Sequence, residues 1–441
     1  MTDLTSLRGA FDTIDAETLL PGDVGYEAVR PAYFGVGDPA AIVRPTTPEQ
    51  VADALRLAQQ HALPVSVRSG GHGAKAFPNP DGLVIDVSGI DSIEVLPDGL
   101  VRVGSGATWG AVAEALAPHG LIVTSGDTRD VGVGGLALGG GMGWLVRAVG
   151  LTIDILESVE LVTVDGRSIT ASAESEPELF WALRGGGGNF GVATHFTFRA
   201  SPLPAVVGGR IHLALDDLGG VLTAWRDVMR AAPDELSVTF LALPAFDPSA
   251  APSAQLLVCY AGDDEAAGLA AIAPLLELPG VTGSDIALRP YLDLVEEAMT
   301  PPPVTMVGGN GFADLDDQTI ADYTASIAGS PGPTIASIRY LGGAFSRVPT
   351  DATAFAIRDR EVMLFRVVLL PPDAAPELIA AAEAPWAPMK QRITSTYGNF
   401  VEKGDPAQLP LLYPPATLER LRAVKTQFDP DNVLARNHNI V

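Results

Sequence analysis

The amino-acid sequence predicts an α+β fold, in which a glycine-rich N-terminal part precedes an antiparallel sheet covered by helices on one face. Glycine is concentrated early in the chain, with 30 of the 47 glycines in residues 1–200. Beyond Pro202-Leu203-Pro204, runs typical of strands alternate with Ala/Leu-rich stretches typical of helices. Apolar residues make up 47% of the 441 residues and charged residues 18%, which excludes an intrinsically disordered chain.

Short elements are predicted in the first 200 residues. Thr47-Pro48-Glu49-Gln50 has the pattern of a capping box with proline at the first helical position, so a helix begins there and ends before Pro64. A second helix is predicted after Thr108 and ends near Gly120. The Asp165-Gly166 pair between apolar runs predicts a hairpin over 161–170. Buried strands are predicted at 65–67, 83–87 and 100–103, and a further helix at 178–184.

The later part of the chain has longer elements. Its strands are predicted at 236–243, 255–260, 336–341 and 362–370, and its helices near 216–231 and 264–278. The prolines between 385 and 388 indicate another boundary. A helix at 418–428 then belongs to a segment that returns to the first part.

Charge and cysteine content narrow the function classes. The net charge of −25 argues against nucleic acid or an anionic membrane as a partner. Cys259 is the only cysteine, so no intrachain disulfide forms, and we interpret it as a small buried residue. The first residues lack a signal-peptide pattern, and the longest uncharged stretch is too short for a membrane span, so we expect a cytoplasmic protein. The six histidines are scattered, so no metal site is predicted.

Eight glycines fall between Gly126 and Gly143. The stretch from Gly132 to Ala137 matches the loose G-x-G-x-x-A dinucleotide pattern, but the residues before it are polar rather than a buried strand, which disfavours a Rossmann loop. Glycine-rich turns also let successive backbone N–H groups converge on an anion. A large anionic cofactor suits that device in an acidic chain with only four lysines, with Arg68 as a candidate side-chain partner.

Four segments together resemble a known family. They are SVRSGGHGAKAF (66–77), SGDTRDVGVGGLALGGGMGWL (125–145), ELFWALRGGGGNFGVATHFTF (178–198), and YGNF (397–400) with TQFDPDNVLARNHNI (426–440). In this order they resemble the FAD-linked oxidases of the vanillyl-alcohol oxidase superfamily, in the berberine-bridge-enzyme-like branch. The resemblance implies a PCMH-type FAD-binding domain of two α/β subdomains, formed by residues 1–205 and completed by 386–441. An antiparallel-sheet substrate domain, 206–385, is inserted between them.

The resemblance also implies how FAD is held. The histidine of the first segment, His72, corresponds to the residue bonded to the flavin 8α-methyl group, and Thr128 stands where some relatives have a second, cysteine link. We therefore expect a single covalent bond, through His72. Arg68, Ser69, Gly70 and Gly71 are expected to cradle the diphosphate together with His72. Backbone approach to the flavin and ribityl chain is expected at Ser125, Gly126, Gly132, Gly135, Gly140 and Gly143, adenine contact at Val192, and contact with the flavin ring at Asn437 and Asn439.

The implied reaction is hydride transfer from a small-molecule alcohol, amine or polyketide to flavin N5, with dioxygen reoxidising the flavin to give hydrogen peroxide. Val131 corresponds to a position that gates oxygen. Tyr397 corresponds to a base in some relatives, and it needs nearby positive charge because a free tyrosine has a pKa near 10. Arg339, Arg358 and Arg360 are the candidate helpers. The alternatives are a tyrosine that only packs against the flavin, a dehydrogenase with another electron acceptor, and a non-catalytic binding protein on the same scaffold.

Overall fold

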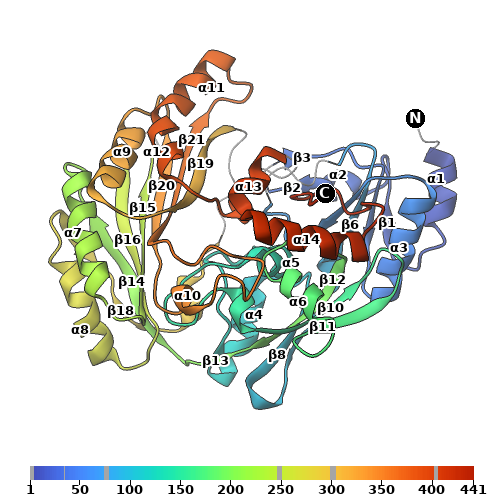
Figure 1. The fold of residues 1–441 in the computed structure, drawn as a ribbon, viewed down its shortest axis with the longest axis horizontal. Coiled ribbons are helices and arrows are strands. Elements are labelled where there is room, and N and C mark those ends of the chain that lie inside the picture. Colours follow the sequence, from blue (N-terminus) through green and yellow to red (C-terminus); the bar gives the residue numbers. More distant parts are fainter. Residues whose placement is uncertain (1–3, 34, 74–78, 246–250, 298–303, 402–405) are drawn as a thin grey trace.

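Two sheets in the N-terminal part and one large antiparallel sheet in the later part organise the chain (Figure 1). The computed structural model describes residues 4–33, 35–73, 79–245, 251–297, 304–401 and 406–441. The large sheet and its helices lie on one side of the view, and the two smaller sheets lie on the other. This arrangement confirms the predicted α+β class.

The first sheet has four strands, in the order β1-β4-β6-β5. Its strands are β1 (Glu17–Leu19), β4 (Ala41–Arg44), β5 (Val65–Arg68) and β6 (Leu83–Asp86), and the helices α1 (Leu4–Phe11) and α3 (Pro48–Gln60) pack beside it. Strands β4, β5 and β6 are parallel. Thr47 caps α3 by accepting a hydrogen bond from Gln50 N–H. The capping box is only half formed, because the Gln50 side chain accepts from Thr46 N–H instead of Thr47 N–H.

The second sheet has five antiparallel strands, in the order β11-β10-β12-β8-β7. They are β7 (Ile93–Val95), β8 (Leu100–Gly104), β10 (Leu156–Val162), β11 (Ser168–Ser172) and β12 (Val192–Arg199). The predicted hairpin is the β10–β11 connection through Asp165-Gly166. One apolar cluster joins this sheet to α4 (Trp109–Leu116), α5 (Val133–Gly139), α6 (Pro177–Leu183) and α14 (Pro415–Phe428).

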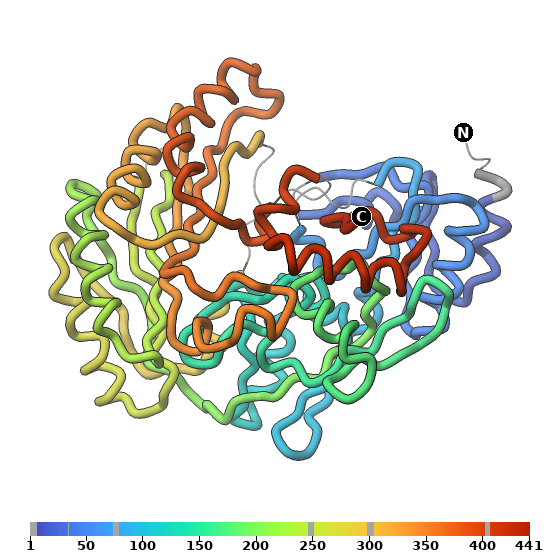
Figure 2. Tube along the Cα trace, viewed as in Figure 1, coloured from blue at the N-terminus to red at the C-terminus, as the bar shows by residue number. Residues whose placement is uncertain are grey.

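The C-terminal helix α14 returns to the N-terminal part, as the sequence predicts. Leu421 and Phe428 are buried in the same cluster as the side chains of α6. Arg420 lies over the Trp181 ring, 3.9 Å from its centroid, and pairs with Glu178. Figure 2 shows this last segment, in red, lying against the green and blue parts of the chain.

The third sheet is antiparallel and has eight strands. Seven of them follow the order β17-β14-β16-β15-β20-β21-β19, and β18 pairs with β14. The strands are β14 (Val206–Leu213), β15 (Leu236–Leu243), β16 (Ser253–Tyr260), β17 (Val281–Ser284), β18 (Ala287–Arg289), β19 (Thr305–Ala313), β20 (Thr334–Tyr340) and β21 (Val362–Leu370).

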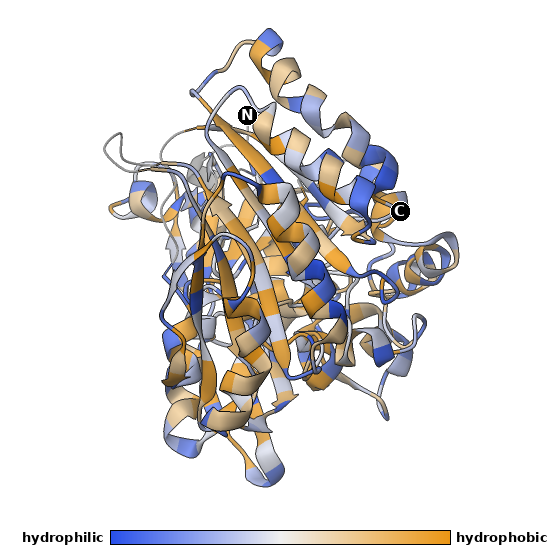
Figure 3. Ribbon diagram, turned by 90° about the vertical axis from the view of Figure 1, so that its left-hand side faces the viewer, coloured by the Kyte–Doolittle hydropathy of each residue, from blue (hydrophilic) through white to orange (hydrophobic). Residues whose placement is uncertain are grey.

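Helices cover one face of this sheet, as Figure 3 shows from their side. They are α7 (Leu218–Ala231), α8 (Glu265–Leu276), α9 (Asp317–Ala328), α11 (Pro376–Glu383) and α12 (Ala387–Arg392). Alternate side chains such as Val238 and Phe240 of β15 are buried beneath them. The residues between, such as Thr239 and Leu241, therefore point to the other face, because successive strand side chains alternate.

The remaining elements are short. They are α2 (Tyr26–Val29), β2 (Pro31–Ala32), β3 (Gly35–Val36), β9 (Leu121–Ile122), β13 (Ser201–Pro202), α10 (Ala344–Arg347) and α13 (Leu409–Leu412), with 3-10 turns between them. Within the described ranges, no helix is long and apolar enough to cross a membrane.

Candidate functional site

The two N-terminal glycine-rich segments touch, backbone against backbone. Gly70 follows β5, and Gly132 precedes α5. A Cβ atom on Gly70 would overlap Gly132 N, and a Cβ atom on Gly132 would overlap Gly70 N and Ser69 Oγ. Ser69 Oγ also donates to the Ser105 carbonyl, 2.6 Å away. Only glycine permits this contact, so the structure brings together the segments that the sequence singles out; residues 74–77 of the first one lie outside the described residues.

The second segment also folds onto itself. A Cβ atom on Gly143 would overlap the carbonyl oxygen of Ser125. Gly140 has a φ of +134°, which L-residues rarely adopt, and it lies against the rings of Phe355 and Tyr397. Gly135 differs, because nothing stands within 4 Å of a Cβ atom placed on it. The segment therefore has a packed side and an open position at the start of α5.

His72 is held by a tyrosine. Its ring stacks on that of Tyr33, with the centroids 4.3 Å apart and the planes 20° from parallel. Tyr33 lies between β2 and β3, and its N–H donates to the Gly71 carbonyl at 3.1 Å. Burial lowers the pKa of the imidazole, and the charge of Asp130 acts in the opposite direction. A lowered pKa favours the neutral imidazole near neutral pH.

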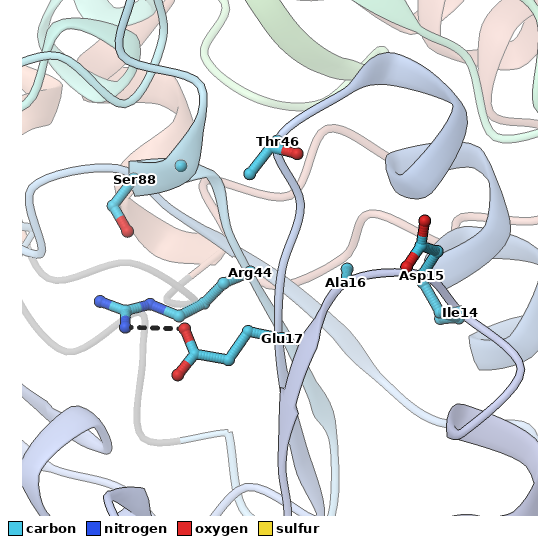
Figure 4. Close-up of a pocket in the computed structure, with 8 residues that line it drawn as sticks. Ile14, Asp15, Ala16, Glu17, Arg44, Thr46 and Ser88 are labelled. Atoms are coloured by element: carbon cyan, nitrogen blue, oxygen red, sulfur yellow. Dashed lines mark hydrogen bonds and ion pairs between the residues drawn. The ribbon is translucent and has the colours of Figure 1, made fainter.

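Arg68 is committed to neighbouring protein groups. Its guanidinium pairs with Asp86 at 2.6 Å and donates to the carbonyls of Val29 and Pro31. Asp86 also pairs with Arg44, which bonds Glu17 at the surface (Figure 4). The pocket in Figure 4 has a volume of about 520 Å³, and the paired side chains of Arg44 and Glu17 are among the residues that line it. Arg68 thus braces the base of the predicted loop, and its contact with a diphosphate stays a prediction.

Tyr397 is buried among aromatic rings. Phe312, Phe355 and Phe400 meet its ring edge-on or at a steep angle. Its hydroxyl oxygen accepts two hydrogen bonds, from Gly141 N–H at 3.1 Å and from the Asn399 amide at 3.0 Å. Burial raises the pKa of Tyr397, whereas these two donors lower it. The two donors favour the deprotonated form, but burial has the larger effect, so the pKa of Tyr397 is raised above its ordinary value.

Of the three predicted arginine helpers, Arg339 is the one that acts on Tyr397. Its guanidinium donates to the Met142 carbonyl and to the Asp127 carboxylate, both in the second glycine-rich segment. Its positive charge also lowers the pKa of Tyr397.

The other two helpers lie in ion pairs of their own. Arg358 forms a buried two-bond pair with Asp154, and Arg360 pairs with Asp314 and Asp359 at the surface. The expectation that these two arginines assist Tyr397 therefore has no support in the geometry.

Three further predicted site residues are Thr128, Val131 and Val192, and each makes contacts within the protein. Thr128 donates to Asp127 at 3.2 Å, and its backbone forms a bridge with Glu296. Val131 is half-buried against the core of the second sheet, and its carbonyl accepts from Trp109 N–H. Val192 begins β12, where its side chain is fully buried.

The predicted asparagines of the tail face the close of the glycine-rich part. The Asn437 amide donates to the carbonyls of Gly188 and Leu434. Gly188, like Gly135, has open space where a Cβ atom would stand. The oxygens of the Asn437 and Asn439 side chains and of the Ser105 hydroxyl are buried without a hydrogen-bond partner among the described residues.

These features fit FAD. Unpartnered buried oxygens and open glycine positions are what a polar ligand requires where protein backbone must approach it closely. Among the described residues, no group of three or more His, Cys, Asp or Glu side chains is placed to hold a metal ion. The arrangement can therefore hold a large polar cofactor between the glycine-rich segments and the tail, with Tyr397 beside them.

Several residues of the site escaped the sequence reasoning. Tyr33 and Asn310 lie outside the four motif segments, whereas Asp127 and Asn399 lie within them without a predicted role. Asn399 lies within YGNF, so its place in a motif is the signal that could have found it. Asn310 accepts from Tyr397 N–H at 2.7 Å and donates to the Phe400 carbonyl. Asn310 lies in β19, a glycine-rich strand whose sequence does not alternate between apolar and polar residues, so its pattern does not indicate a strand.

Family models match both ends of the chain. The model described as "FAD binding domain" matches residues 39–172, and "Berberine and berberine like" matches residues 413–441. An uncharacterised FAD-linked oxidoreductase of Bacillus subtilis, YgaK, is 30% identical over 418 residues, which cover 91% of each chain. This chain belongs to the berberine-bridge-enzyme-like family of FAD-linked oxidoreductases. It has an FAD-binding domain and is an enzyme.

Other relatives share this length and fold. The (R)-6-hydroxynicotine oxidase of Paenarthrobacter nicotinovorans is 29% identical over 453 residues, which cover 97% of each chain. The structure of 6-hydroxy-D-nicotine oxidase from Arthrobacter nicotinovorans superposes with a TM-score of 0.84 and 27% identity, covering 100% of this chain and 99% of the other. The BBE-like 1 protein of Physcomitrella patens has a TM-score of 0.87 at 24% identity, covering 98% and 97%. These likenesses confirm the predicted FAD-binding fold with its inserted sheet.

Proposed function

We propose that this FAD-linked oxidoreductase is an oxidase that removes a hydride and a proton from a small-molecule alcohol, amine or polyketide. The observation that carries the proposal is the Tyr397 hydroxyl, which accepts two hydrogen bonds beside the segment that holds FAD. Two relatives of similar length are named as oxidases, one of 6-hydroxynicotine and one of xylooligosaccharides.

The chain is divided, in this proposal, as the resemblance implies. Residues 1–205 and 386–441 form the FAD-binding unit, and 206–385 form the substrate unit. The glycine positions from Gly126 to Gly143 bring backbone groups to the flavin, and Val192, Asn437 and Asn439 complete the cofactor site. The unpartnered oxygens of Ser105, Asn437 and Asn439 support this placement.

The flavin is bonded once, through His72. A glucooligosaccharide oxidase of Acremonium strictum with the same fold is described as carrying 6-S-cysteinyl, 8α-N1-histidyl FAD. Here Thr128 stands at the cysteine position of the matching segment and cannot form a thioether. Cys259 is buried, and burial raises the pKa of its thiol to about 12, so it stays protonated and unreactive.

Tyr397 takes the substrate proton. Gly141 N–H and the Asn399 amide hold its oxygen in place and stabilise negative charge on it, and Arg339 adds positive charge nearby. Phe312 and Phe355 exclude water from its ring. FAD, when bound, supplies the hydride acceptor, and dioxygen takes up the two electrons as hydrogen peroxide. The half-buried Val131 leaves room for dioxygen in this proposal.

A peroxide assay tests the proposal. The purified holoenzyme is given alcohols, amines and phenolic substrates in air, and hydrogen peroxide is measured against substrate consumed. We expect one peroxide for each substrate oxidised, and reoxidation of the reduced flavin by dioxygen faster than turnover. Slow reoxidation by dioxygen together with fast reoxidation by an artificial electron acceptor would make the enzyme a dehydrogenase instead.

A further inference from the structure

The connection between β20 and β21, residues 341–361, lies against the glycine-rich part of the chain (Figure 2, orange). Near its start, the Ala344 N–H donates to the Arg147 carbonyl, 2.6 Å away. Farther along, the Phe355 N–H donates to the Arg184 carbonyl at 3.2 Å, just beyond the end of α6. The β20–β21 connection is therefore bound at more than one point to the part of the chain that carries the glycine motifs.

Phe355 of this connection lies between the second glycine-rich segment and Tyr397. A Cβ atom on Gly140 would stand 3.2 Å from the Phe355 ring, and the ring centroids of Phe355 and Tyr397 are 6.1 Å apart. A Cβ atom on Gly185 would overlap the Phe355 backbone nitrogen, so a larger residue there would displace Phe355. Phe355 is 6% exposed and belongs to one apolar cluster with Tyr397. Its ring therefore covers one side of the candidate base.

Arg358 holds Phe355 by its backbone and by its ring. The Arg358 Nε donates to the Phe355 carbonyl at 3.2 Å, and the guanidinium carbon lies 5.3 Å from the centroid of the Phe355 ring. Two further hydrogen bonds of 2.8 Å join this guanidinium to the Asp154 carboxylate. Asp154 lies in the 3-10 turn Thr152–Ile155 and also accepts from the Leu151 N–H at 2.8 Å. Asp154 thus fixes Arg358, and Arg358 fixes Phe355.

The ion pair between Arg358 and Asp154 is better explained by orientation than by stability. The two side chains are only 1% and 6% exposed. Taking two charges out of water costs much of the free energy that their attraction returns, so apolar residues of similar volume are often at least as stabilising. The planar guanidinium, in contrast, fixes the directions of its hydrogen bonds. Arg358 adds no net charge near Tyr397, because Asp154 neutralises it, and what it supplies is the position of Phe355.

We infer that Arg358 and Asp154 are positioning residues for Tyr397. They act through Phe355, whose ring keeps water from the phenol and keeps the phenol oxygen at the Gly141 N–H. A general base must lie within hydrogen-bond reach of the proton it takes, and a displacement of about 1 Å can lower a rate by about 10²-fold. The catalytic consequence rests on the proposed function, whereas the covering of Tyr397 can be tested without a substrate.

Nitration by tetranitromethane tests the covering of Tyr397 in the holoenzyme, with the modified tyrosines located by peptide mass spectrometry. The test variant is Arg358→Met/Asp154→Asn, which removes both charges together because a single charge left buried can prevent folding. We expect nitration of Tyr397 to become about tenfold faster or more, which corresponds to about 1.4 kcal/mol less free energy of local exposure. The buried Tyr323 and Tyr413 should react as slowly as in the unmodified enzyme.

The matched control is Arg347→Met/Asp234→Asn, the same exchange in an exposed ion pair that Arg347 of the β20–β21 connection makes. It should leave the nitration of Tyr397 unchanged. Equal nitration of Tyr397 in the test variant and the unmodified enzyme overturns the inference. Faster nitration of Tyr323 as well would indicate general loosening of the protein, and that result also overturns it.

The rate of flavin reduction shows whether the position of Phe355 matters for catalysis. It is measured anaerobically with the compound that gives the most peroxide in the assay above. Arg358→Met/Asp154→Asn should lower the maximal rate by about 10–10²-fold, with the half-saturating substrate concentration and the bound flavin per chain unchanged. In a Phe355→Leu background the same two changes should cause no further loss, because residues that act through a shared partner are not additive.

A further loss in the Phe355→Leu background would overturn the route through Phe355. If no compound reduces the flavin while the nitration of Tyr397 responds as expected, the proposed function fails and the positioning of Phe355 by Arg358 and Asp154 stands.

Discussion

In the proposed site, the glycine-rich part and the large sheet provide the two sides by different means. In the first, Gly70 and Gly132 meet backbone to backbone, and most predicted cofactor contacts are backbone groups. In the second, side chains such as Asn310 and Phe312 project from a regular strand toward Tyr397. Backbone recognition imposes strict residue types on the sequence, because a Cβ atom at Gly132 has no room. Side-chain recognition on a sheet allows substitution without disturbing the fold.

In the glycine-rich part, His72 is the side chain whose substitution should have the largest effect on cofactor attachment. His72→Ala should abolish covalent flavin, because no other described residue of the loop has a nucleophilic ring nitrogen at this position. The measurement is flavin fluorescence on the polypeptide after acid denaturation and washing. Free FAD released from the variant would show that the cofactor site itself survives. Protein-bound fluorescence in the variant would contradict the single-link proposal.

Tyr397 joins the two halves, since its ring packs on the sheet and its oxygen receives Gly141 N–H. Tyr397→Phe should lower the rate of substrate reduction of the flavin by about 10²–10⁴-fold, the usual contribution of a general base. Rapid-mixing absorbance under anaerobic conditions measures that rate. An unchanged rate would leave Tyr397 with a packing role.

The pH dependence of the flavin reduction rate tests the same assignment, because the direction of the change can be predicted. Burial raises the pKa of Tyr397 above its ordinary value near 10. The reactive deprotonated form therefore increases with pH through the neutral and alkaline range, and the reduction rate should increase with it. The increase should be absent in Tyr397→Phe. A rate that falls with rising pH in the unmodified enzyme would contradict this assignment.

The same contrast explains how much the sequence could predict. The hairpin at Asp165-Gly166 and the strands 236–243 and 362–370 have local signals, and the structure has them at the predicted places. Strand β19 was not predicted, because its sequence TMVGGNGFA has three glycines and no alternation. Helix α9 was missed as well, in a stretch where polar residues and alanine give only a weak apolar face.

The candidate site also combines residues that motifs predict with contacts that depend on strand pairing. The glycine motifs predict the cofactor side, and the structure brings two of their segments into close backbone contact, which requires glycine. Arg68 was expected at a diphosphate, but its pairing with Asp86 depends on β5 and β6 lying side by side, which the sequence does not display. The contact of Asn310 with Tyr397 likewise depends on β19 lying beside the C-terminal segment, which the sequence does not display.

Gly132 and Gly135 of the second glycine-rich segment allow two roles of glycine to be tested, close backbone packing and close approach to the cofactor. Gly132→Ala should destabilise the protein by about 1–3 kcal/mol or more, because its Cβ atom would overlap backbone. Gly135→Ala should stabilise the apoprotein slightly, since glycine inside a helix costs about 0.5–1 kcal/mol relative to alanine. Gly135→Ala should nevertheless lower FAD occupancy if the flavin fills the open space above it. Thermal unfolding of the apoprotein and the bound flavin per chain are the two measurements; full occupancy in Gly135→Ala would place FAD elsewhere.

Substitution of Tyr33 should have the smallest and most selective effect in the glycine-rich part. Its ring stacks on His72, and its N–H holds the Gly71 carbonyl, so ring and backbone contributions can be separated. Tyr33→Ala keeps the backbone bond but removes the ring, and should lower the covalently bound fraction of FAD by a few-fold while total FAD stays the same. Tyr33→Phe keeps the stacked ring and should restore the covalent fraction, which a role for the hydroxyl would not allow. Equal covalent fractions in Tyr33→Ala and the unmodified enzyme would show that the glycine turn alone orients His72.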